Sequence, residues 1–321
     1  MKALVLESKN QAIQYKDVPD PQPSEGQVIV QLKSAALNRR DYFITQGLYP
    51  NIIFPCILGS DGAGLYNNRE IIINPNNNWG DNTHFQSKEY HILGLPKQGT
   101  LAKYIAIGED RLVDKPVHLT WEQAAALPLA GMTAYRALFT KGQVKAGDRV
   151  LITGIGGGVA LFAMQFAIAA GAKVFVTSGT VEKITKAMEM GAAGGVNYND
   201  KNWNQQLVEQ AGSFDIILDS AGGESFVPLP KLCNPGGRIV IYGGTLGKIP
   251  EISPQIIFWR QLSILGTTMA TDAEFKDMIH FVNEYKILPV VDSVFDLKHG
   301  NAAFEKLAQS DQFGKIVINI N

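Results

Sequence analysis

The segment from Val150 to Ala172 constrains the fold of this chain more than any other part of the sequence. Residues 150–153 are apolar or β-branched, which is typical of a buried parallel strand. A glycine-dense turn follows, and then an apolar run over 159–170 that is too long for a strand and ends at Gly171, a helix C-cap residue. Strand, glycine turn and helix form a unit that holds pyrophosphate, because glycines let the backbone approach the anion and the helix N-terminus offers unpaired N–H groups.

The glycines of this turn match the usual fingerprint only in part. Gly154-x-Gly156-x-x-Val159 lacks the third glycine of G-x-G-x-x-G, and Gly154-x-x-Gly157-x-x-Ala160 is an alternative register. A purely structural turn is the simpler explanation of such glycines. A second strand and helix follow at once, however, and this is the context that a dinucleotide site requires. We therefore predict dinucleotide contacts at Gly154, Gly156, Gly157, Gly158 and Val159.

The alternation of strands and helices continues downstream. Further strands are predicted at 173–177, 195–198, 214–219, 238–242 and 262–266, with helices between them. This alternation predicts an α/β fold with a doubly wound parallel sheet. Ligands of such sheets bind at the carboxyl ends of the strands. Those ends carry further candidates for cofactor contact, namely Ser178, Ser220, Ala221, Gly243, Gly244 and Thr245.

The first part of the chain is different in kind. Short alternating strands are predicted at 2–6, 27–33, 69–73 and 101–107, with prolines and glycine between them, which indicates a β-rich domain of the barrel type. The tail, over 314–318, reads as one more strand that returns to this domain. We predict two domains: residues 1–122 with 268–321, and residues 123–267. The helix that starts near Trp121 is the expected crossing point.

Composition excludes several classes of protein. The chain is 45% hydrophobic with a net charge of −1, so it offers no basic face to nucleic acid. No apolar run is long enough to cross a bilayer, and Met1 to Leu6 is too short for a signal sequence. Cys56 and Cys233 fall in different predicted domains and give no disulfide framework. We predict a cytoplasmic globular enzyme.

The stretch from Asn67 to Asn82 is compositionally unusual. It holds seven asparagines among prolines and glycines. We predict a solvated loop here, with a lid over the substrate as the alternative.

Four segments carry a family resemblance. They are Ala36–Asp41 (ALNRRD), Ile57–Gly64 (ILGSDGAG), Ala124–Tyr135 (AAALPLAGMTAY) and Phe214–Gly223 (FDIILDSAGG). With the order of the domains, they make the chain similar to the medium-chain dehydrogenase/reductase superfamily, and most similar to its zinc-free quinone oxidoreductases and enoyl reductases. The resemblance implies a Rossmann doubly wound parallel sheet with a β-rich GroES-like barrel domain. It also implies NADPH-dependent reduction of quinones or α,β-unsaturated carbonyls by hydride transfer.

The residues argue against a bound metal. A catalytic zinc needs three ligands from Cys, His and Asp or Glu. Zinc-dependent relatives have Cys where this chain has Asn38, and His where it has Ser60. A structural zinc needs four clustered cysteines, and the chain has two. Of the five histidines, only His84 and His91 lie close together, and they are expected to be loop residues. Without a Lewis acid for an alkoxide, an alcohol dehydrogenase is disfavoured.

The end of the second strand of the doubly wound sheet favours NADP(H) over NAD. An NAD site has an acidic residue there for the ribose 2′-OH, but this strand ends Thr177-Ser178-Gly179. Glu182 lies in the following helix, where it supports the helix N-terminus. Ser178 and Lys183 supply the hydroxyl and the cation that a 2′-phosphate prefers. The resemblance adds Tyr198. Taken singly, Lys183 is also explained as an exposed helix lysine and Tyr198 as a packing aromatic.

The resemblance places the nicotinamide in the cleft between the domains, bordered by Asn38, Thr133, Gly243-Gly244 and the loop after Ser263. Thr133 also fits a role inside its own helix. Asp41 either caps a helix or faces the cleft. For Arg39 and Arg40, binding of an anionic substrate and a solvated turn both stay open.

Tyr49 is the candidate proton donor. It lies eleven residues after Asn38, and its segment resembles the one in which enoyl reductases carry a proton-donating tyrosine. A loop aromatic beside Pro50 is the alternative. Tyr42 is a nearby rival, but its place in a predicted helical turn favours packing.

The resemblance also implies a homodimer, because superfamily members commonly dimerise by joining the last strands of two dinucleotide-binding sheets. Leu262–Gly266 is apolar and is otherwise an exposed edge, which proteins usually cover. Phe258 and Trp259 add apolar area, although they also fit a core. A non-catalytic NADP(H)-binding sensor on the same fold remains an alternative function.

Overall fold

The computed structural model describes residues 1–320, and these form two compact units. Unit 1 contains residues 1–132 and the chain from Ala270 onward, and unit 2 contains residues 133–269. Helix α2 (Trp121–Ala126), which the sequence analysis gave as the expected crossing point between domains, belongs to unit 1.

Unit 1 is β-rich, as predicted. A three-stranded sheet has the order β2 (Gln14–Asp17), β1 (Lys2–Leu6), β4 (Cys56–Ile57). A seven-stranded sheet runs β10 (Leu112–Asp114), β6 (Arg69–Ile73), β5 (Asp61–Tyr66), β3 (Gln27–Ala36), β18 (Lys315–Asn319), β17 (Val291–Asp296), and β9 (Tyr104–Gly108) also pairs with β3. The tail strand returns as predicted, since β18 pairs antiparallel with β3 through Val317 and Ala36.

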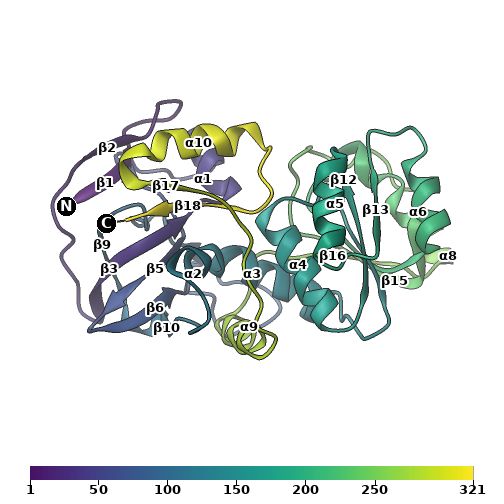
Figure 1. Cartoon of the computed structure of the whole chain (residues 1–321), viewed down its shortest axis with the longest axis horizontal. Coiled ribbons are helices and arrows are strands. Elements are labelled where there is room, and N and C mark those ends of the chain that lie inside the picture. The colour runs from purple at the N-terminus through teal and green to yellow at the C-terminus, as the bar shows by residue number, and fades with distance from the viewer. Residues whose placement is uncertain (321) are drawn as a thin grey trace. The chain divides into compact units, whose positions relative to one another are not determined.

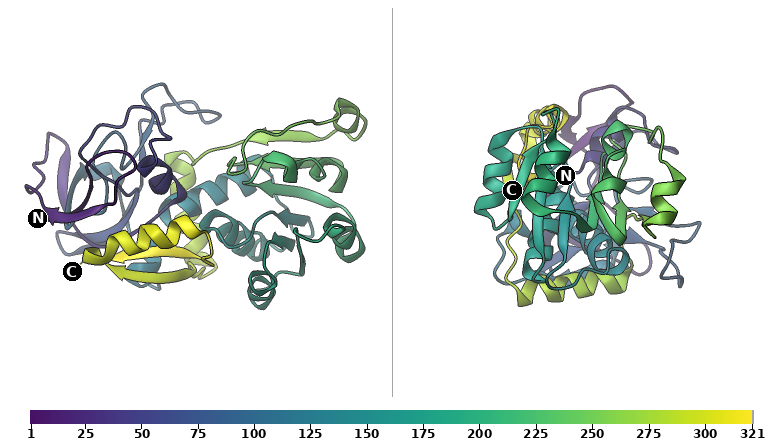
Figure 2. Two further views of the ribbon diagram at one scale, coloured as in Figure 1. Left: turned by 90° about the horizontal axis from the view of Figure 1, so that it is seen from above. Right: turned by 90° about the vertical axis from the view of Figure 1, so that its right-hand side faces the viewer.

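The helices of unit 1 are short apart from two. They are α1 (Arg39–Thr45), α2, the start of α3 (Pro128–Tyr135), α9 (Asp272–Glu284) and α10 (Gly300–Gln309), with short 3-10 turns at Glu109–Arg111 and Leu297–His299. Helix α10 runs alongside β17 and β18 (Figures 1 and 2). It thereby covers the strand pair that closes the chain.

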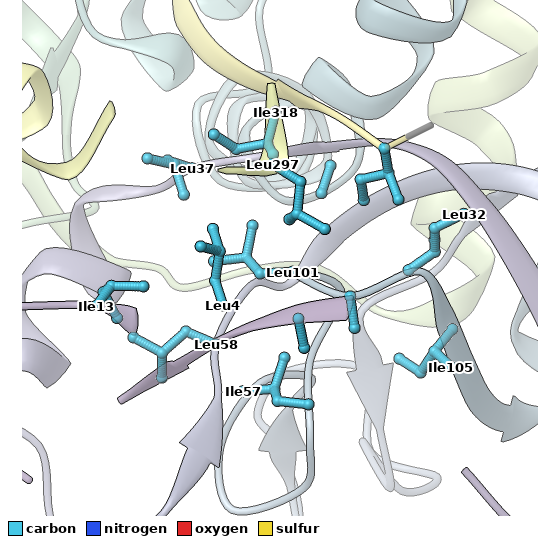
Figure 3. Packing of buried hydrophobic residues seen from close by; sticks show 14 of the residues in the cluster. Leu4, Ile13, Leu32, Leu37, Ile57, Leu58, Leu101, Ile105, Leu297 and Ile318 are labelled. Carbon is cyan, nitrogen blue, oxygen red and sulfur yellow. The ribbon is translucent and has the colours of Figure 1, made fainter. Parts of the chain in front are cut away.

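An apolar core fills unit 1. Leu4 of β1, Leu101 and Ile318 of β18 are almost fully buried, and Figure 3 shows their side chains gathered with Leu58 and Leu297 from distant parts of the sequence. Burying each such leucine or isoleucine contributes roughly 1.5–3 kcal/mol. The core therefore fixes the strands whose ends carry the polar residues described below.

Unit 2 has the predicted doubly wound sheet. Six parallel strands lie in the order β13 (Gly194–Asn197), β12 (Lys173–Ser178), β11 (Arg149–Ile152), β14 (Phe214–Asp219), β15 (Cys233–Ile241), β16 (Ser263–Gly266). Helices lie on both faces of the sheet (Figure 2). They are α4 (Gly158–Ala169), α5 (Val181–Glu189), α6 (Trp203–Ala211), α7 (Leu229–Leu232) and α8 (Pro254–Trp259), after a π-helical turn at Arg136–Lys141.

One strand of unit 2 differs from its prediction. The strand predicted at 238–242 begins earlier, because the Pro235-Gly236-Gly237 segment lies inside β15, where the pairing jumps from Phe214–Cys233 to Ile216–Arg238. The glycines and the proline are accommodated because this jump is a bulge, in which residues leave the ladder.

The Asn-rich stretch is not a simple solvated loop, so that prediction is wrong for its middle part, residues 71–76, which are buried. Asn74 and Asn76 are buried, while residues from Gly80 to Asn82 are exposed. The Asn74 amide donates to Asp272 at 2.8 Å, and Tyr90 donates its hydroxyl to Asn76 at 2.7 Å. A buried amide with such partners costs little, and composition alone does not distinguish it from a hydrated one. Among residues 1–320, no helix is both long enough and apolar enough to cross a membrane.

Candidate active site

In unit 2 the strand order reverses between β11 and β14. Chain order runs outward from β11 through β12 to β13, and then from β14 through β15 to β16 on the other side. In open parallel sheets, ligands bind beside the carboxyl ends of the strands at such a point of reversal. The loops at this point are Gly154–Gly157 and Ser220–Gly223.

The glycine loop after β11 leaves room for a ligand. Gly157 is the N-cap of α4, so no side chain caps the first N–H groups of this helix. A Cβ added to Gly157 would meet no atom within 4 Å. Gly154 has a φ of +65°, and a Cβ there also meets open space. Since neither glycine is required by a neighbouring atom, the open space in front of α4 fits an anion bound by the helix N-terminus.

Hydrogen bonds hold this loop in place. The Gly154 and Ile155 N–H groups donate to the Thr177 hydroxyl (3.1 Å) and carbonyl (2.8 Å) in β12. The remaining predicted members, Gly156, Gly158 and Val159, lie in the same turn and the first residues of α4. The structure thus gathers all five predicted phosphate-contact residues at the start of one helix.

A buried carboxylate, missed from the sequence, joins the two central loops. Asp219 ends β14 and is fully buried. It accepts the Thr153 hydroxyl at 2.6 Å and the Gly222 N–H at 2.8 Å. The available signal was an acidic residue directly after the apolar run 216–218. Asp219 therefore fixes the spacing between the loops after β11 and β14.

The loop after β15 adds the remaining candidates at this edge. The Thr245 N–H donates to the Ser220 carbonyl at 3.3 Å, and the Leu246 N–H donates to the Ala221 carbonyl at 2.8 Å. A Cβ at Gly243 would lie 2.8 Å from the Ser220 oxygen, so a glycine is required for this approach. Ser220, Ala221, Gly243, Gly244 and Thr245 are thus brought together.

The end of β12 carries the residues predicted to select the dinucleotide. Ser178 is buried, and its hydroxyl accepts the Thr180 N–H at 3.3 Å. The half-exposed Tyr198 lies close to Gly179. A Cβ on Gly179 would be only 2.7 Å from the Tyr198 hydroxyl oxygen. Lys183 is partly buried near the start of α5. Thr133 lies apart from these residues along the chain, in α3, where its hydroxyl is buried and approaches the Met269 Sδ at 3.9 Å.

Unit 1 contains a buried polar cluster around Asn38. The Asn38 amide donates to Asp61 Oδ2 at 2.8 Å, and its carbonyl oxygen accepts from the Lys315 ammonium, which also contacts Asp61 Oδ2 at 3.0 Å. Strand register explains the meeting, since Ala36 of β3 pairs with Asp61 of β5 and with Val317 of β18. The Asn38 side chain is therefore fixed, with one amide N–H unused by any residue in 1–320.

Asp61 and Lys315 were missed as site residues by sequence reasoning. Asp61 was noticed only as part of a family segment. Lys315 is a charged residue at the head of the apolar strand β18 and is almost fully buried. A lysine buried at such a position indicates a specific partner.

Asp41 acts as a cap in this structure. Its fully buried carboxylate accepts the Asn38 N–H at 2.8 Å and the Gly59 N–H at 3.3 Å. Burial raises the pKa of the Asp41 carboxyl above its ordinary value. Of the two roles left open by the sequence, the geometry favours the cap, which makes Asp41 a positioning residue for Asn38.

The two arginines of this segment differ in environment. Arg39 donates to the Leu307 carbonyl (2.8 Å) and the Ser310 hydroxyl (2.7 Å), tying α1 to α10. Arg40 is buried, with its guanidinium bound to Ser60 and its carbon atom Cζ 5.6 Å from the centre of the Tyr49 ring. Neither residue belongs to a solvated turn.

Comparisons with known proteins agree with this architecture. Residues 158–284 match the family model described as zinc-binding dehydrogenase. A zinc-type alcohol dehydrogenase-like protein of Leptosphaeria maculans is 35% identical, over 96% of this chain and 94% of that protein. The chain belongs to the medium-chain dehydrogenase/reductase superfamily.

Other superfamily members indicate the branch. The human quinone oxidoreductase is 28% identical over 94% of this chain and 92% of its own length, and an acryloyl-coenzyme A reductase of Sulfurisphaera tokodaii is 28% identical over 99% of both. Among solved structures, one described as an NAD-dependent alcohol dehydrogenase gives a TM-score of 0.94 at 33% identity and covers 100% of both chains. The quinone oxidoreductase of Thermus thermophilus, described in complex with NADPH, gives 0.84 at 26%, covering 99% of this chain and 100% of that one. The resemblance to the quinone oxidoreductase-like branch and the predicted fold class are confirmed.

Two relatives are named zinc-type alcohol dehydrogenase-like proteins, but a zinc ion does not fit the corresponding residues of this superfamily member. Among residues 1–320, no group of three or more His, Cys, Asp and Glu side chains is arranged to hold a metal. Asn38 and Ser60 already accept hydrogen bonds from the cations of Lys315 and Arg40, which a metal would have to displace. Cys56 and Cys233 lie in different units, and burial raises the pKa of each thiol to about 11.

Proposed function

We propose that this chain is an NADPH-dependent reductase of quinones or α,β-unsaturated carbonyls that works without a metal. The observation that carries the proposal is the polar cluster of unit 1. Asn38 and Ser60, at the positions where zinc-dependent relatives have metal ligands, are each hydrogen-bonded to a buried cation, Lys315 and Arg40 respectively. Such a cluster offers hydrogen-bond donors to a carbonyl oxygen but no Lewis acid for an alkoxide. The names of the human quinone oxidoreductase and of the acryloyl-coenzyme A reductase support the same class of substrate.

We assign dinucleotide binding to residues of unit 2, and substrate binding and protonation to residues of unit 1. The glycine loop, the β12 end and the loops after β14 and β15 would hold the dinucleotide. When bound in its reduced form, the nicotinamide supplies the hydride. Asn38, held by Asp61 and Lys315, presents one amide N–H in a fixed orientation. Tyr49, whose hydroxyl bonds to no residue in 1–320, is the candidate proton donor.

The proposal is tested by following NADPH consumption with a panel of quinones, enones, enals and enoyl thioesters. We expect turnover with at least one of these classes in protein washed with chelator. Tight NADPH binding without any turnover would favour the sensor function. Alcohol oxidation that requires added zinc would instead place the chain among the alcohol dehydrogenases.

The preference for NADPH is a separate prediction, since one similar structure is described as NAD-dependent. We expect the dissociation constant of NADPH to be at least about tenfold lower than that of NADH, a difference of roughly 1.4 kcal/mol. Ser178→Asp should reverse the order, because a carboxylate at the end of β12 repels the 2′-phosphate and accepts a ribose hydroxyl. Titration of both cofactors measures this, with Ser178→Ala as the uncharged control. Equal constants for the two cofactors in the unmodified protein would refute the prediction.

We also propose a homodimer. Strand β16 is the last strand of the unit 2 sheet and pairs with β15 on one side only. Near it, the side chains of Phe258 and Trp259 are 52% and 78% exposed. Pairing with a second copy would cover this edge. Light scattering at micromolar concentration should give twice the chain mass, and a monomer there would contradict the proposal.

A further inference from the structure

Arg40 is a buried cation held at one end of its guanidinium. Its side chain is 8% exposed. The Nη1 group donates to the Ser60 hydroxyl and to the Leu93 carbonyl, the latter at 2.9 Å. The Ser60 hydroxyl in turn donates to the same carbonyl at 2.8 Å. The Ser60 hydroxyl and the Leu93 carbonyl thus fix the position of the guanidinium.

The opposite edge of the guanidinium has no partner. Nε is buried and makes no hydrogen bond, and Nη2 makes none with any residue in 1–320. Nε and Nη2 together form the edge with which arginine binds oxyanions. A buried donor without an acceptor is costly, so its presence calls for an explanation such as a ligand.

The nearby carboxylates do not neutralise Arg40 by direct pairing. Asp61 is paired with Lys315, and the oxygens of Asp41 accept the N–H groups of Asn38 and Gly59. Over residues 1–320, no ion pair joins Arg40 to a carboxylate. The charge of Asp41 acts on Arg40 through space, but among these residues the free edge of the guanidinium has no carboxylate hydrogen-bonded to it.

The aromatic neighbour of Arg40 is the candidate proton donor. The guanidinium carbon lies 5.6 Å from the centre of the Tyr49 ring. Arg40 can donate hydrogen bonds to a negatively charged oxygen, and the neighbouring Tyr49 can donate a proton. Reduction of an activated double bond requires both functions.

We propose that Arg40 is a catalytic residue whose free edge, through Nη2, binds the carbonyl oxygen of the substrate and stabilises the enolate formed during reduction. This inference rests on the proposed reductase function and specifies the group that binds the reacting oxygen.

Reduction of the activated double bond combines a hydride transfer with a proton transfer. The β-carbon of the substrate receives hydride with its electron pair, and the nicotinamide is oxidised by two electrons. The π pair of the C=C bond moves to form the enolate, whose oxygen carries the negative charge beside Arg40. The α-carbon then takes a proton from Tyr49 or water, and the carbonyl is restored.

A binding experiment tests the oxyanion site without turnover. We use 4-nitrophenolate, at a pH at which the phenol is ionised, as a stable mimic of an enolate oxygen. Its dissociation constant from the NADP⁺-loaded protein should rise at least about tenfold in Arg40→Met, as expected for loss of a charge-assisted bond. Arg39→Met removes the neighbouring guanidinium and should leave phenolate binding unchanged. Unchanged binding in folded Arg40→Met would overturn the inference.

Kinetics with an enone provide the second arm. In Arg40→Met we expect kcat to fall by about 10²- to 10³-fold, the usual effect of removing one oxyanion donor, with the NADPH dissociation constant unchanged. If that variant does not fold, Arg40→Lys serves instead, because it keeps a cation near Ser60 but lacks the free edge, and the same loss is expected. Normal kcat in either folded variant overturns the inference and leaves the reductase function intact. Arg40-dependent phenolate binding in a protein without any turnover would support the oxyanion site and refute the proposed function.

Discussion

Replacing Tyr49 by phenylalanine is expected to lower enone turnover by about 10²- to 10⁴-fold, the usual contribution of a positioned acid. The Tyr49 ring is partly buried against the core of unit 1 and lies beside the Arg40 guanidinium. Its hydroxyl makes no hydrogen bond with the residues that the structure describes, so it is available to a substrate. Removing one oxygen leaves the packing of the ring in place. Initial-rate assays with an enone measure turnover, and titration with NADPH shows separately whether cofactor affinity is unchanged.

Tyr42→Phe is the matched control for this experiment. Tyr42 lies in α1, also packs against the core of unit 1, and has its ring 6.0 Å from the Arg39 guanidinium. The same loss of a hydroxyl there should leave turnover unchanged. Quinones should be affected less than enones by Tyr49→Phe, because they aromatise after accepting hydride. Normal enone turnover in Tyr49→Phe would remove Tyr49 from the mechanism and leave water as the proton source.

The residues that we propose to bind the dinucleotide could be placed together from the sequence, because each follows its strand directly. Gly154 to Val159 follow β11, Ser178 ends β12, and Ser220 follows β14. In a parallel sheet the carboxyl ends of the strands meet at one edge, so local pattern alone places these residues together. Asp219 was missed because a single acid at a strand end has several structural explanations.

The cluster of unit 1 was predictable only in part. Asn38 and Lys315 are separated by 277 residues, and they meet because β3 pairs with both β5 and β18. The register of antiparallel strands depends on turns and on which face is buried, so sequence pattern does not reveal which residues lie opposite each other. Arg40 was ambiguous for a related reason, since its long side chain reaches Ser60 and Leu93 from another part of the fold.

Replacing Gly157 by aspartate is expected to separate stability from cofactor affinity. Gly157 has a φ of −78° and a ψ of 156°, which any residue adopts, and a Cβ there meets no atom within 4 Å. Aspartate is a favoured N-cap residue and its charge suits the helix N-terminus, so stability should stay the same or rise by about 0.5–1 kcal/mol. The same carboxylate would repel the pyrophosphate from the place that it needs, so we expect the NADPH dissociation constant to rise by on the order of 100-fold, or about 2.7 kcal/mol.

Two measurements and one control complete this test. Thermal unfolding reports stability, and fluorescence titration with NADPH reports affinity. Gly157→Asn adds a side chain of the same size and a similar capping preference but no charge. It therefore separates the effect of side-chain volume on NADPH affinity from the effect of charge repulsion. We expect its affinity to lie between those of the unmodified protein and Gly157→Asp. Undiminished NADPH binding by Gly157→Asp would show that the glycine loop serves only as a turn. A loss of affinity in a protein at least as stable as the original has no explanation in misfolding, and it would assign the open space before α4 to the pyrophosphate.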